Sequence, residues 1–160
     1  MMSLQRKLSW LELKIPPVPL VVIFMLLIRL ISSWTPGIQI SSQSRFITIA
    51  TFIVLGFLCA FSGVLSFNRA KTTVNPLAPD KSSSLVTSGI YRYTRNPMYV
   101  GFLFFLMGFG VYLSNLYALA STTLFVVYMN KFQIRPEERA LEAIFGAEFI
   151  AYKNKVRRWL

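Results

Sequence analysis

Four apolar segments limit how this chain of 160 residues can fold. They cover about residues 17–34, 46–67, 98–114 and 116–132, and each is close to the ~20 residues that a helix needs to span a bilayer. More than half of the chain is hydrophobic, and its mean hydropathy of +0.53 is too high for an ordinary soluble domain. We expect one all-α, polytopic membrane domain over residues 1–160, with about four transmembrane helices, a cytoplasmic loop and a C-terminal amphipathic helix.

The last two apolar segments are separated by little more than Asn115, so they predict a tight helical hairpin. Two antiparallel helices of similar length return the chain to the level at which it started. Residues 95–99 precede this hairpin, and Glu137 and Glu138 follow it. We therefore expect these two groups to be neighbours at the open end of the hairpin.

Basic residues are concentrated on one side of the predicted bundle. The formal charge is +11, from seventeen Lys and Arg against six acids. All but two of the seventeen fall in the N-terminal arm, the loop between the second and third segments or the C-terminal tail, whereas Arg29 and Arg45 fall near the opposite side. The positive-inside rule then places both termini in the cytoplasm. Because the basic residues flank apolar stretches, we expect them to meet anionic membrane lipids and not nucleic acid.

The chain contains no histidine and one cysteine, Cys59, which lies inside an apolar segment. An internal disulfide and a histidine-dependent catalytic triad are therefore excluded, and a zinc site of the usual Cys/His type is not expected. We predict no metal site. Chemistry must come from carboxylates, Arg, Lys, Tyr, Asn, backbone groups or a bound cofactor.

Small residues recur on one face of the second and third segments. Gly56, Ala60 and Gly63 lie at spacings of four and three in the second segment. Gly101 and Gly108 lie seven residues apart in the third. Such faces allow membrane helices to approach closely. Tight packing explains them, and a cleft that admits a lipid chain is the functional alternative.

Residues beyond the fourth segment predict an amphipathic helix. Pro136 suits its first position, and Glu137 and Glu138 complement the positive end of the helix dipole. Gly146 is expected to break or bend this helix. We expect the basic helix to lie along the membrane surface. Its apolar stripe recurs at steps of three and four residues: Leu141, Phe145, Phe149, Tyr152, Val156 and Trp159.

Two further segments are polar. Residues 1–14 predict an interfacial lead-in to a retained helix and not a signal peptide, since no small-residue cleavage site follows the first apolar segment. Residues 72–89 are rich in turn formers, with Pro76 and Pro79 opposing a helix. Non-helical backbone beside a membrane must be solvated or packed on protein.

Polar and aromatic residues crowd against the start of the third apolar segment in GIYRYTRNPMYVG, residues 89–101. About forty residues later the chain reads PEERALEAIFGAEFIAYKNKVRRW. Together, at this spacing, the two motifs resemble the isoprenylcysteine carboxyl methyltransferase family, which shows G-x-Y…R-H-P-x-Y-x-G, paired acids and then F-G-x-E-Y-x-x-Y. The related phospholipid N-methyltransferases share the paired acids and the small membrane-embedded architecture. The resemblance covers about residues 72–160.

The resemblance implies S-adenosyl-L-methionine as the methyl donor and a lipophilic or prenylated acceptor. It places the cofactor at the cytoplasmic ends of the last helices, partly covered by the C-terminal segment. The sulfonium of this cofactor makes its methyl group electrophilic, so the protein has to align the reactants and need not supply a nucleophile. The cofactor-binding residues that the resemblance implies are Ser84, Leu85, Val86, Tyr91, Asn96, Pro97, Met98, Tyr99, Glu137 and Glu138.

Two positions depart from the pattern of the family. Asn96 replaces a histidine, and its amide can form hydrogen bonds but cannot change charge near neutral pH. Gln133 stands where the family has an arginine that helps to hold the substrate carboxylate, and Arg135 lies two residues away. The predicted catalytic residues are Arg95, Gln133 and Arg135. The acceptor stays open between a prenylcysteine-type carboxylate and another apolar molecule.

Structural explanations exist for the same residues. Glu137 and Glu138 suit any helix start, residues 95–97 suit an interfacial helix cap, and the tyrosines suit an aromatic belt. Two other functions also stay open: a nicotinamide-dependent reductase like the sterol C14-reductases, and a non-catalytic membrane scaffold or small transporter. Against transport, the predicted helices lack paired internal charges and broken midplane segments.

Overall fold

The computed structural model describes residues 12–70 and 84–160, which fold mainly into helices. Residues 1–11 of the interfacial lead-in expected over residues 1–14 lie outside the described residues, as does most of the polar loop, with Pro76 and Pro79. In chain order the elements are α2 (Pro17–Trp34), α3 (Ser42–Arg69), the 3-10 turn η3 (Gly89–Arg92), α4 (Pro97–Tyr112), α5 (Leu116–Ala120), α6 (Thr122–Tyr128), the π-helical turn η4 (Met129–Ile134) and α7 (Arg135–Lys155).

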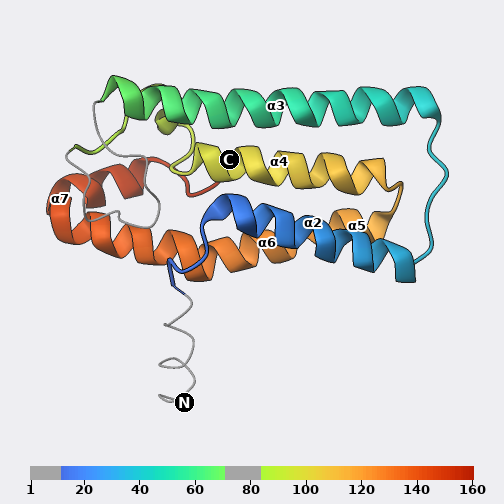
Figure 1. Cartoon of the computed structure of the whole chain (residues 1–160). Helices are drawn as coiled ribbons and strands as arrows, with labels where there is room; N and C mark the ends of the chain where they lie inside the picture. The colour runs from blue at the N-terminus through green and yellow to red at the C-terminus, as the bar shows by residue number, and fades with distance from the viewer. Residues whose placement is uncertain (1–11, 71–83) are drawn as a thin grey trace, which may run out of the picture.

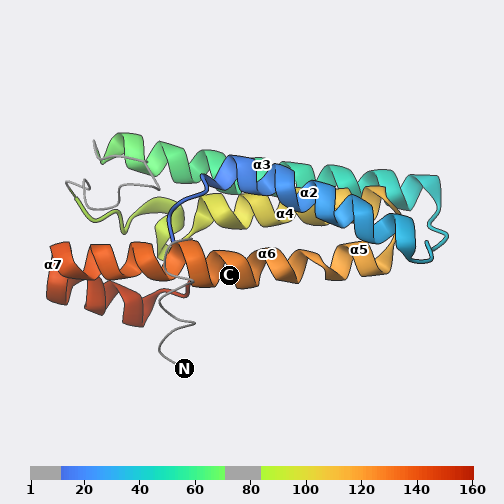
Figure 2. The same ribbon diagram turned by 60° about the horizontal axis from the view of Figure 1, so that its bottom comes forward.

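The long helices run side by side along one axis, and α4 is the central one (Figure 1). It contacts α2, α3, α5 and α6. One end of the bundle carries the connections from α2 to α3 and from α4 to α5. The other end carries η3, α7 and the start of α2, as Figure 2 also shows. The segments that bear the two sequence motifs therefore meet at a single end of the bundle.

Within the described residues, two helices are long and apolar enough to cross a membrane: α2, with 18 residues, and α3, with 28. α4 is apolar but has 16 residues. At 1.5 Å per residue it is about 24 Å long, short of the ~30 Å hydrocarbon core of a bilayer. The predicted all-helical class is confirmed for the described residues, and two of the four predicted spanning helices have the length and composition to cross a membrane.

The fourth apolar segment is interrupted where a single helix is expected. α5 ends at Ala120 and α6 begins at Thr122. The hydroxyl of Ser121 donates to the carbonyl of Ala118 at 2.7 Å, and that of Thr122 donates to the carbonyl of Leu119 at 2.8 Å. Side chains that bond back to the preceding turn compete with the helical ladder.

The chain passes from α6 through η4 into α7 without a loop (Figure 2). Pro136 has no N–H group, so it cannot bond the carbonyl of Phe132 four residues earlier. The backbone N–H of Leu13 donates to that carbonyl instead, at 3.0 Å. η4, directly ahead of α7, is thus bonded to the segment ahead of α2, a contact that no local pattern predicts.

A hydrophobic core forms where α2, α4 and α6 meet. Phe24 and Ile28 of α2 are buried against Leu106 of α4 and Phe125 of α6. The rings of Phe24 and Phe125 meet edge to face, with their centroids 5.4 Å apart. Tyr99, near the start of α4, belongs to the same core, so the packing of the bundle fixes its position.

α3 packs on α4 through their small residues. A Cβ atom added at Gly101 would lie 2.7 Å from the carbonyl oxygen of Gly56 and 3.0 Å from the Cβ of Ala60. One added at Gly63 would lie 2.9 Å from the Cγ of Met98. The prediction of close helix packing is confirmed, and at these positions the two helices touch.

Asn115 fixes the hairpin at the other end of the bundle. Its Oδ1 accepts the N–H of Ala118 at 2.9 Å and so caps α5. Its Nδ2 donates to the hydroxyl of Thr35 at 2.9 Å, which joins the turn between α4 and α5 to the end of α2. The predicted tight hairpin is confirmed.

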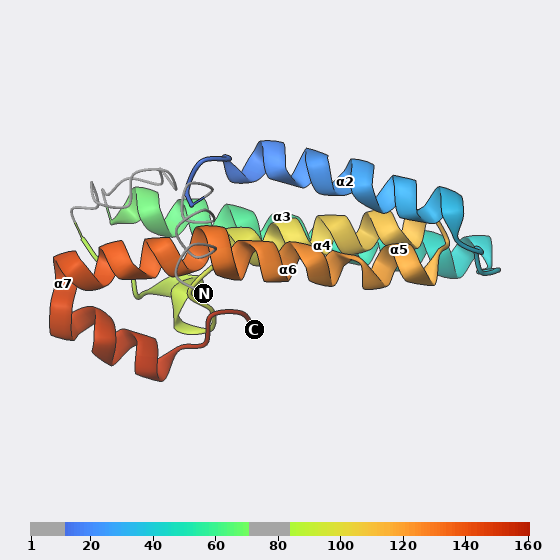
Figure 3. The same ribbon diagram turned by 90° about the horizontal axis from the view of Figure 1, so that it is seen from below.

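Gly146 reverses the direction of α7. Its φ of 49° and ψ of −122° favour glycine, and the second half of α7 returns beside the first (Figure 3). The predicted bend is confirmed. The stripe that the sequence assigns to the membrane surface packs on protein instead, because Phe149 and Tyr152 are buried against Val86 and Tyr91.

We expect Gly101→Val to lower the free energy of unfolding by about 1–3 kcal/mol, the usual cost of forcing extra atoms into a packed core. The added side chain would have to displace the backbone of α3 at Gly56. Thermal unfolding in detergent micelles measures the change. Val54→Leu enlarges a residue of α3 that is 55% exposed and should leave the midpoint unchanged. An equal midpoint in both variants would contradict the close contact.

Candidate functional site

Two polar clusters lie where α4 and α7 begin. Pro97 starts α4, because its fixed φ suits the first helical position, and Tyr99 follows within the first turn. Glu137 and Glu138 lie in the first turn of α7. The predicted adjacency of the two segments is confirmed, since Tyr99 donates to Glu137 and Arg95 donates to Glu138.

Glu137 is held by neutral donors. The Tyr99 hydroxyl donates to Oε1 of Glu137 at 2.5 Å, and Nε2 of Gln133 donates to the same oxygen at 2.8 Å. Both donor residues are buried, with Tyr99 5% and Gln133 2% exposed. Across residues 12–70 and 84–160, no Lys or Arg forms an ion pair with Glu137.

Burial of the carboxyl group raises the pKa of Glu137 to about 7. The hydrogen bonds from Tyr99 and Gln133 oppose this rise, and the nearby charge of Glu138 adds to it. Glu137 is therefore close to half ionised at neutral pH. A cationic group beside it would favour the ionised form, and buried acids with pKa values shifted in this way are concentrated at functional sites.

Glu138 is held by two arginines. Nη2 of Arg95 donates to its Oε1 at 2.7 Å, and Nη2 of Arg158 donates to its Oε2 at 2.6 Å. Burial favours a higher pKa for Glu138, but the hydrogen bonds from Arg158 and Arg95 outweigh it and hold the pKa below its usual range. One acid of the pair is thus neutralised by the protein, and the other is not.

Arg95 also binds the C-terminal end of α7. Its Nη1 donates to the carbonyls of Lys153 at 2.8 Å and Val156 at 2.5 Å, and its backbone N–H donates to the carbonyl of Arg157 at 2.9 Å. In the described part of the chain its Nε is buried without a partner. The catalytic role assigned to Arg95 stays a prediction, and its observed contacts join segments of the protein.

Residues 156–160 return along the start of α4 (Figure 1). The carbonyl of Arg158 accepts from Nδ2 of Asn96 at 2.9 Å and from the hydroxyl of Thr94 at 3.2 Å. The indole N–H of Trp159 donates to Oδ1 of Asn130 at 3.1 Å. The sequence patterns predicted no contacts for Thr94, Asn130 or Arg158. They indicated Arg157 and Arg158 only as basic residues that set the membrane orientation.

An apolar wall adjoins the acids. Val86, Tyr91 and Tyr152 are buried together, and Leu85 packs against them. The Tyr152 hydroxyl donates to the carbonyl of Tyr91 at 2.7 Å. Burial raises the pKa of Tyr91, and the nearby Tyr152 and Glu137 raise it further. Tyr91 therefore lies within electrostatic range of Glu137.

Other residues of the predicted site point elsewhere. Met98 packs on Gly63 of α3. Arg135 is exposed whereas Gln133 is buried, so these two residues lie on different faces. Ser84 donates to a backbone carbonyl just past the end of α3, at 3.2 Å. The cofactor-binding and catalytic roles of all these residues stay predictions.

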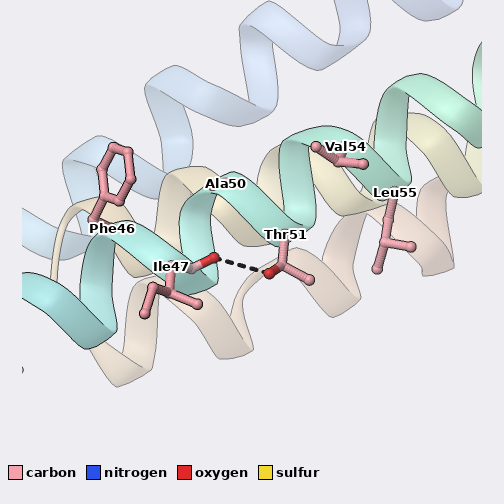
Figure 4. A pocket seen from close by; sticks show the side chains of 6 residues that line it. All are labelled: Phe46, Ile47, Ala50, Thr51, Val54 and Leu55. Atoms are coloured by element: carbon pink, nitrogen blue, oxygen red, sulfur yellow. Dashed lines mark hydrogen bonds between the residues drawn. The ribbon is translucent and has the colours of Figure 1, made fainter.

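A shallow apolar hollow on the first half of α3 lies at the bundle end away from α7 (Figure 4). The one hydroxyl in its lining belongs to Thr51, which donates to the carbonyl of Ile47 at 2.9 Å. The hollow therefore adds no reactive group to the site. Its lining residues are Phe46, Ile47, Ala50, Thr51, Val54 and Leu55.

The donor set at the start of α4 and α7 suits an organic cation. Among the residues with described positions, no three His, Cys, Asp or Glu side chains gather as metal ligands would. In the described part of the chain, Glu137 offers a carboxylate without a cationic partner, and neutral donors hold it in place.

Comparison with known proteins gives the family. The family described as phospholipid methyltransferase matches residues 44–148, well over half of the chain. The protein-S-isoprenylcysteine O-methyltransferase of Saccharomyces cerevisiae is 31% identical over 129 residues, which cover 76% of this chain and 53% of that protein. The enzyme of the same name from Schizosaccharomyces pombe is 34% identical over 110 residues, covering 64% of this chain and 45% of that protein.

A shorter relative matches along its whole length. This uncharacterized protein of Haemophilus influenzae is 43% identical over 63 residues, which cover 39% of this chain. The chain spans about half the length of the two yeast methyltransferases. The chain therefore belongs to the phospholipid methyltransferase family, with isoprenylcysteine O-methyltransferases among its relatives, as its two motifs predict.

Proposed function

We propose that this chain transfers a methyl group from S-adenosylmethionine to a lipid-like acceptor at the cytoplasmic face of a membrane. The observation that carries the proposal is the unequal pairing of two adjacent acids. Glu138 is bound by two arginines, whereas Glu137 receives hydrogen bonds only from neutral groups in the described part of the chain. A partly buried carboxylate of this kind is costly unless a cation joins it.

The residues around Glu137 fit the proposed cofactor. S-adenosylmethionine carries an ammonium and a sulfonium group, and when bound it supplies a methyl group that is already electrophilic. The carboxylate of Glu137 would hold the ammonium or a ribose hydroxyl through a charge-assisted hydrogen bond. Tyr91 lies within electrostatic range of the same carboxylate.

Alignment is the main task left to the protein. The bonds from Tyr99 and Gln133 fix the orientation of the Glu137 carboxylate, and Tyr99 is in turn fixed by the core of the bundle. Good alignment of reactants can lower a reaction barrier by ~7–11 kcal/mol. These residues would therefore contribute by preorganisation, without proton transfer or a covalent intermediate.

The proposed acceptor follows from the relatives. Two of them are named protein-S-isoprenylcysteine O-methyltransferases, so a prenylated cysteine with a free carboxyl group is the first acceptor to test. Gln133 occupies the position of the family's carboxylate-binding arginine and already donates to Glu137. Transfer of labelled methyl groups should be compared between the prenylated cysteine, its methyl ester and a membrane lipid extract.

The proposed topology has several membrane passes and both termini in the cytoplasm. Leu13 is bonded to Phe132, and Arg95 is bonded to Arg157, so the first and last described residues both lie at the end of the bundle that carries α7. Most of the basic residues fall in the N-terminal arm, the loop that follows α3 and the C-terminal tail, which are the sequence segments that adjoin this end. The positive-inside rule supports its cytoplasmic orientation.

We expect Glu137→Gln to weaken binding of S-adenosylmethionine about 10- to 100-fold, because a hydrogen bond to a charged group contributes ~1.5–3 kcal/mol. Tyr99→Phe should weaken it less, since it removes one donor to the carboxylate. Calorimetry on the detergent-solubilised protein measures both. The controls are Glu148→Gln, an exposed acid of the same helix, and Tyr112→Phe, at the other end of α4 with 61% of its surface exposed.

The same titrations distinguish the competing functions. Saturable binding of S-adenosylhomocysteine that depends on Glu137 supports the methyltransferase. Binding of a nicotinamide dinucleotide instead would indicate a reductase. A folded protein that binds neither would indicate a scaffold or transporter, and the proposed function would be wrong.

Cofactor affinity should rise from about pH 6 to about pH 8. The pKa of Glu137 is about 7, so acidification protonates the carboxyl group and removes the charge that attracts the cation. Calorimetry over this range measures the dependence. Glu137→Gln has no proton to lose at this position and should show a flatter profile, whereas an unchanged pH dependence in that variant would assign the titration to another group.

Reporter domains fused to either end should be active in the cytoplasm and inactive outside it. The expected result follows from the common location of Leu13 and Arg157 at the α7 end of the bundle. Paired reporters that fold on opposite sides of the membrane measure the orientation. An external position of either terminus would overturn the proposed topology.

A further inference from the structure

The tail places an arginine beside Glu138, the second acid of the pair. Arg158 donates twice to Glu138, from Nη2 at 2.6 Å and from Nε at 3.1 Å. Arg95 approaches the same carboxylate from the segment ahead of α4, at 2.7 Å. Glu138 therefore carries two cationic partners, while the adjacent Glu137 carries none within the described residues.

Arg158 is held in place by the backbone around it. Its carbonyl accepts from the side chains of Asn96 and Thr94, and the preceding carbonyl of Arg157 accepts the N–H of Arg95. The following residue, Trp159, packs against the core of the bundle. The side chain of Arg158 is about one-third exposed, at 31%, so its contact with Glu138 rests on this anchoring of the tail.

We propose that Arg158 is a positioning residue for the cofactor site, which by pairing with Glu138 keeps Glu137 ionised and available to a cationic ligand. The inference rests on the proposed function, in which Glu137 binds the cofactor. It adds a specific role for the C-terminal tail. Without Arg158, only Arg95 would offset the negative charge of Glu138, and more of that charge would act on Glu137.

The groups that face the two acids determine the sign of the effect. Glu137 faces Tyr99 of α4 and Gln133 of η4 and is within range of Tyr91 of η3. All three are neutral near pH 7, so the charge nearest to Glu137 is that of Glu138, which raises the pKa of Glu137.

Substitutions at Arg158 and Glu138 should thus have opposite effects on the pH dependence of cofactor binding. Arg158→Gln leaves Glu138 less compensated, so the pKa of Glu137 rises and the midpoint of binding moves to higher pH. Glu138→Gln removes the repelling charge, so the midpoint moves to lower pH. Each shift should be about one pH unit, the lower end of what a neighbouring charge produces.

The experiment measures binding of S-adenosylmethionine to the full-length protein by calorimetry between about pH 5.5 and about pH 9, a range chosen to bracket the titration of Glu137. Arg157→Gln is the matched control, because it removes the same charge from the neighbouring, exposed residue. Arg158→Lys should restore most of the wild-type midpoint. In a Glu138→Gln background, Arg158→Gln should shift the midpoint less than it does alone, since its main partner is absent.

The outcomes are separable. Opposite shifts in Arg158→Gln and Glu138→Gln, with Arg157→Gln unchanged, support the inference. Weaker binding at every pH with an unmoved midpoint would make Arg158 a merely structural residue and overturn it. An Arg158→Gln protein that does not fold leaves the test to Glu138→Gln, whose midpoint must fall. Wild-type protein that binds no cofactor would overturn the proposed function itself.

Discussion

The buried guanidinium of Arg95 is the contact on which the organisation of this end of the bundle depends. It binds the Glu138 carboxylate at the start of α7 and two backbone carbonyls at the end of α7. A buried charge is tolerated only when it is paired and hydrogen-bonded. The Arg95 guanidinium therefore needs both the Glu138 carboxylate and the two carbonyls as partners. The single side chain thereby fixes both halves of the reversed helix against the segment that leads into α4.

The two acids show how adjacent residues acquire different roles. Both occupy the first turn of α7. Glu138 pairs with arginines and stabilises the fold, whereas Glu137 keeps a pKa above its ordinary value. A carboxyl group of this kind contributes its stability at low pH and loses it as the pH rises through the folded-state pKa. The unliganded protein therefore gives up some stability at Glu137, as functional sites commonly do.

Local sequence patterns were sufficient for α2, for the hairpin after α4 and for half of the site. Residues 17–34 form α2 with the predicted limits, and the short turn at Asn115 brings Tyr99 beside Glu137. Local patterns could not predict that the tail returns to α4. Its position depends on hydrogen bonds of Arg158 with Asn96 and Thr94, which are far from it in sequence. The prediction that the apolar stripe of α7 faces the membrane was wrong for a physical reason, because protein and lipid can bury such a stripe equally well.

The unequal lengths of α3 and α4 have a consequence for access. Gly63 of α3 lies against Met98 at the start of α4, and α3 continues to Arg69, about 9 Å further at 1.5 Å per residue. The hydrogen bond between Tyr99 and Glu137 therefore lies below the level at which α3 ends. In the proposed topology Tyr99 and Glu137 would lie nearer to the bilayer than the end of α3 does, and the head of an amphiphile would reach them while its hydrocarbon chain stays in the membrane.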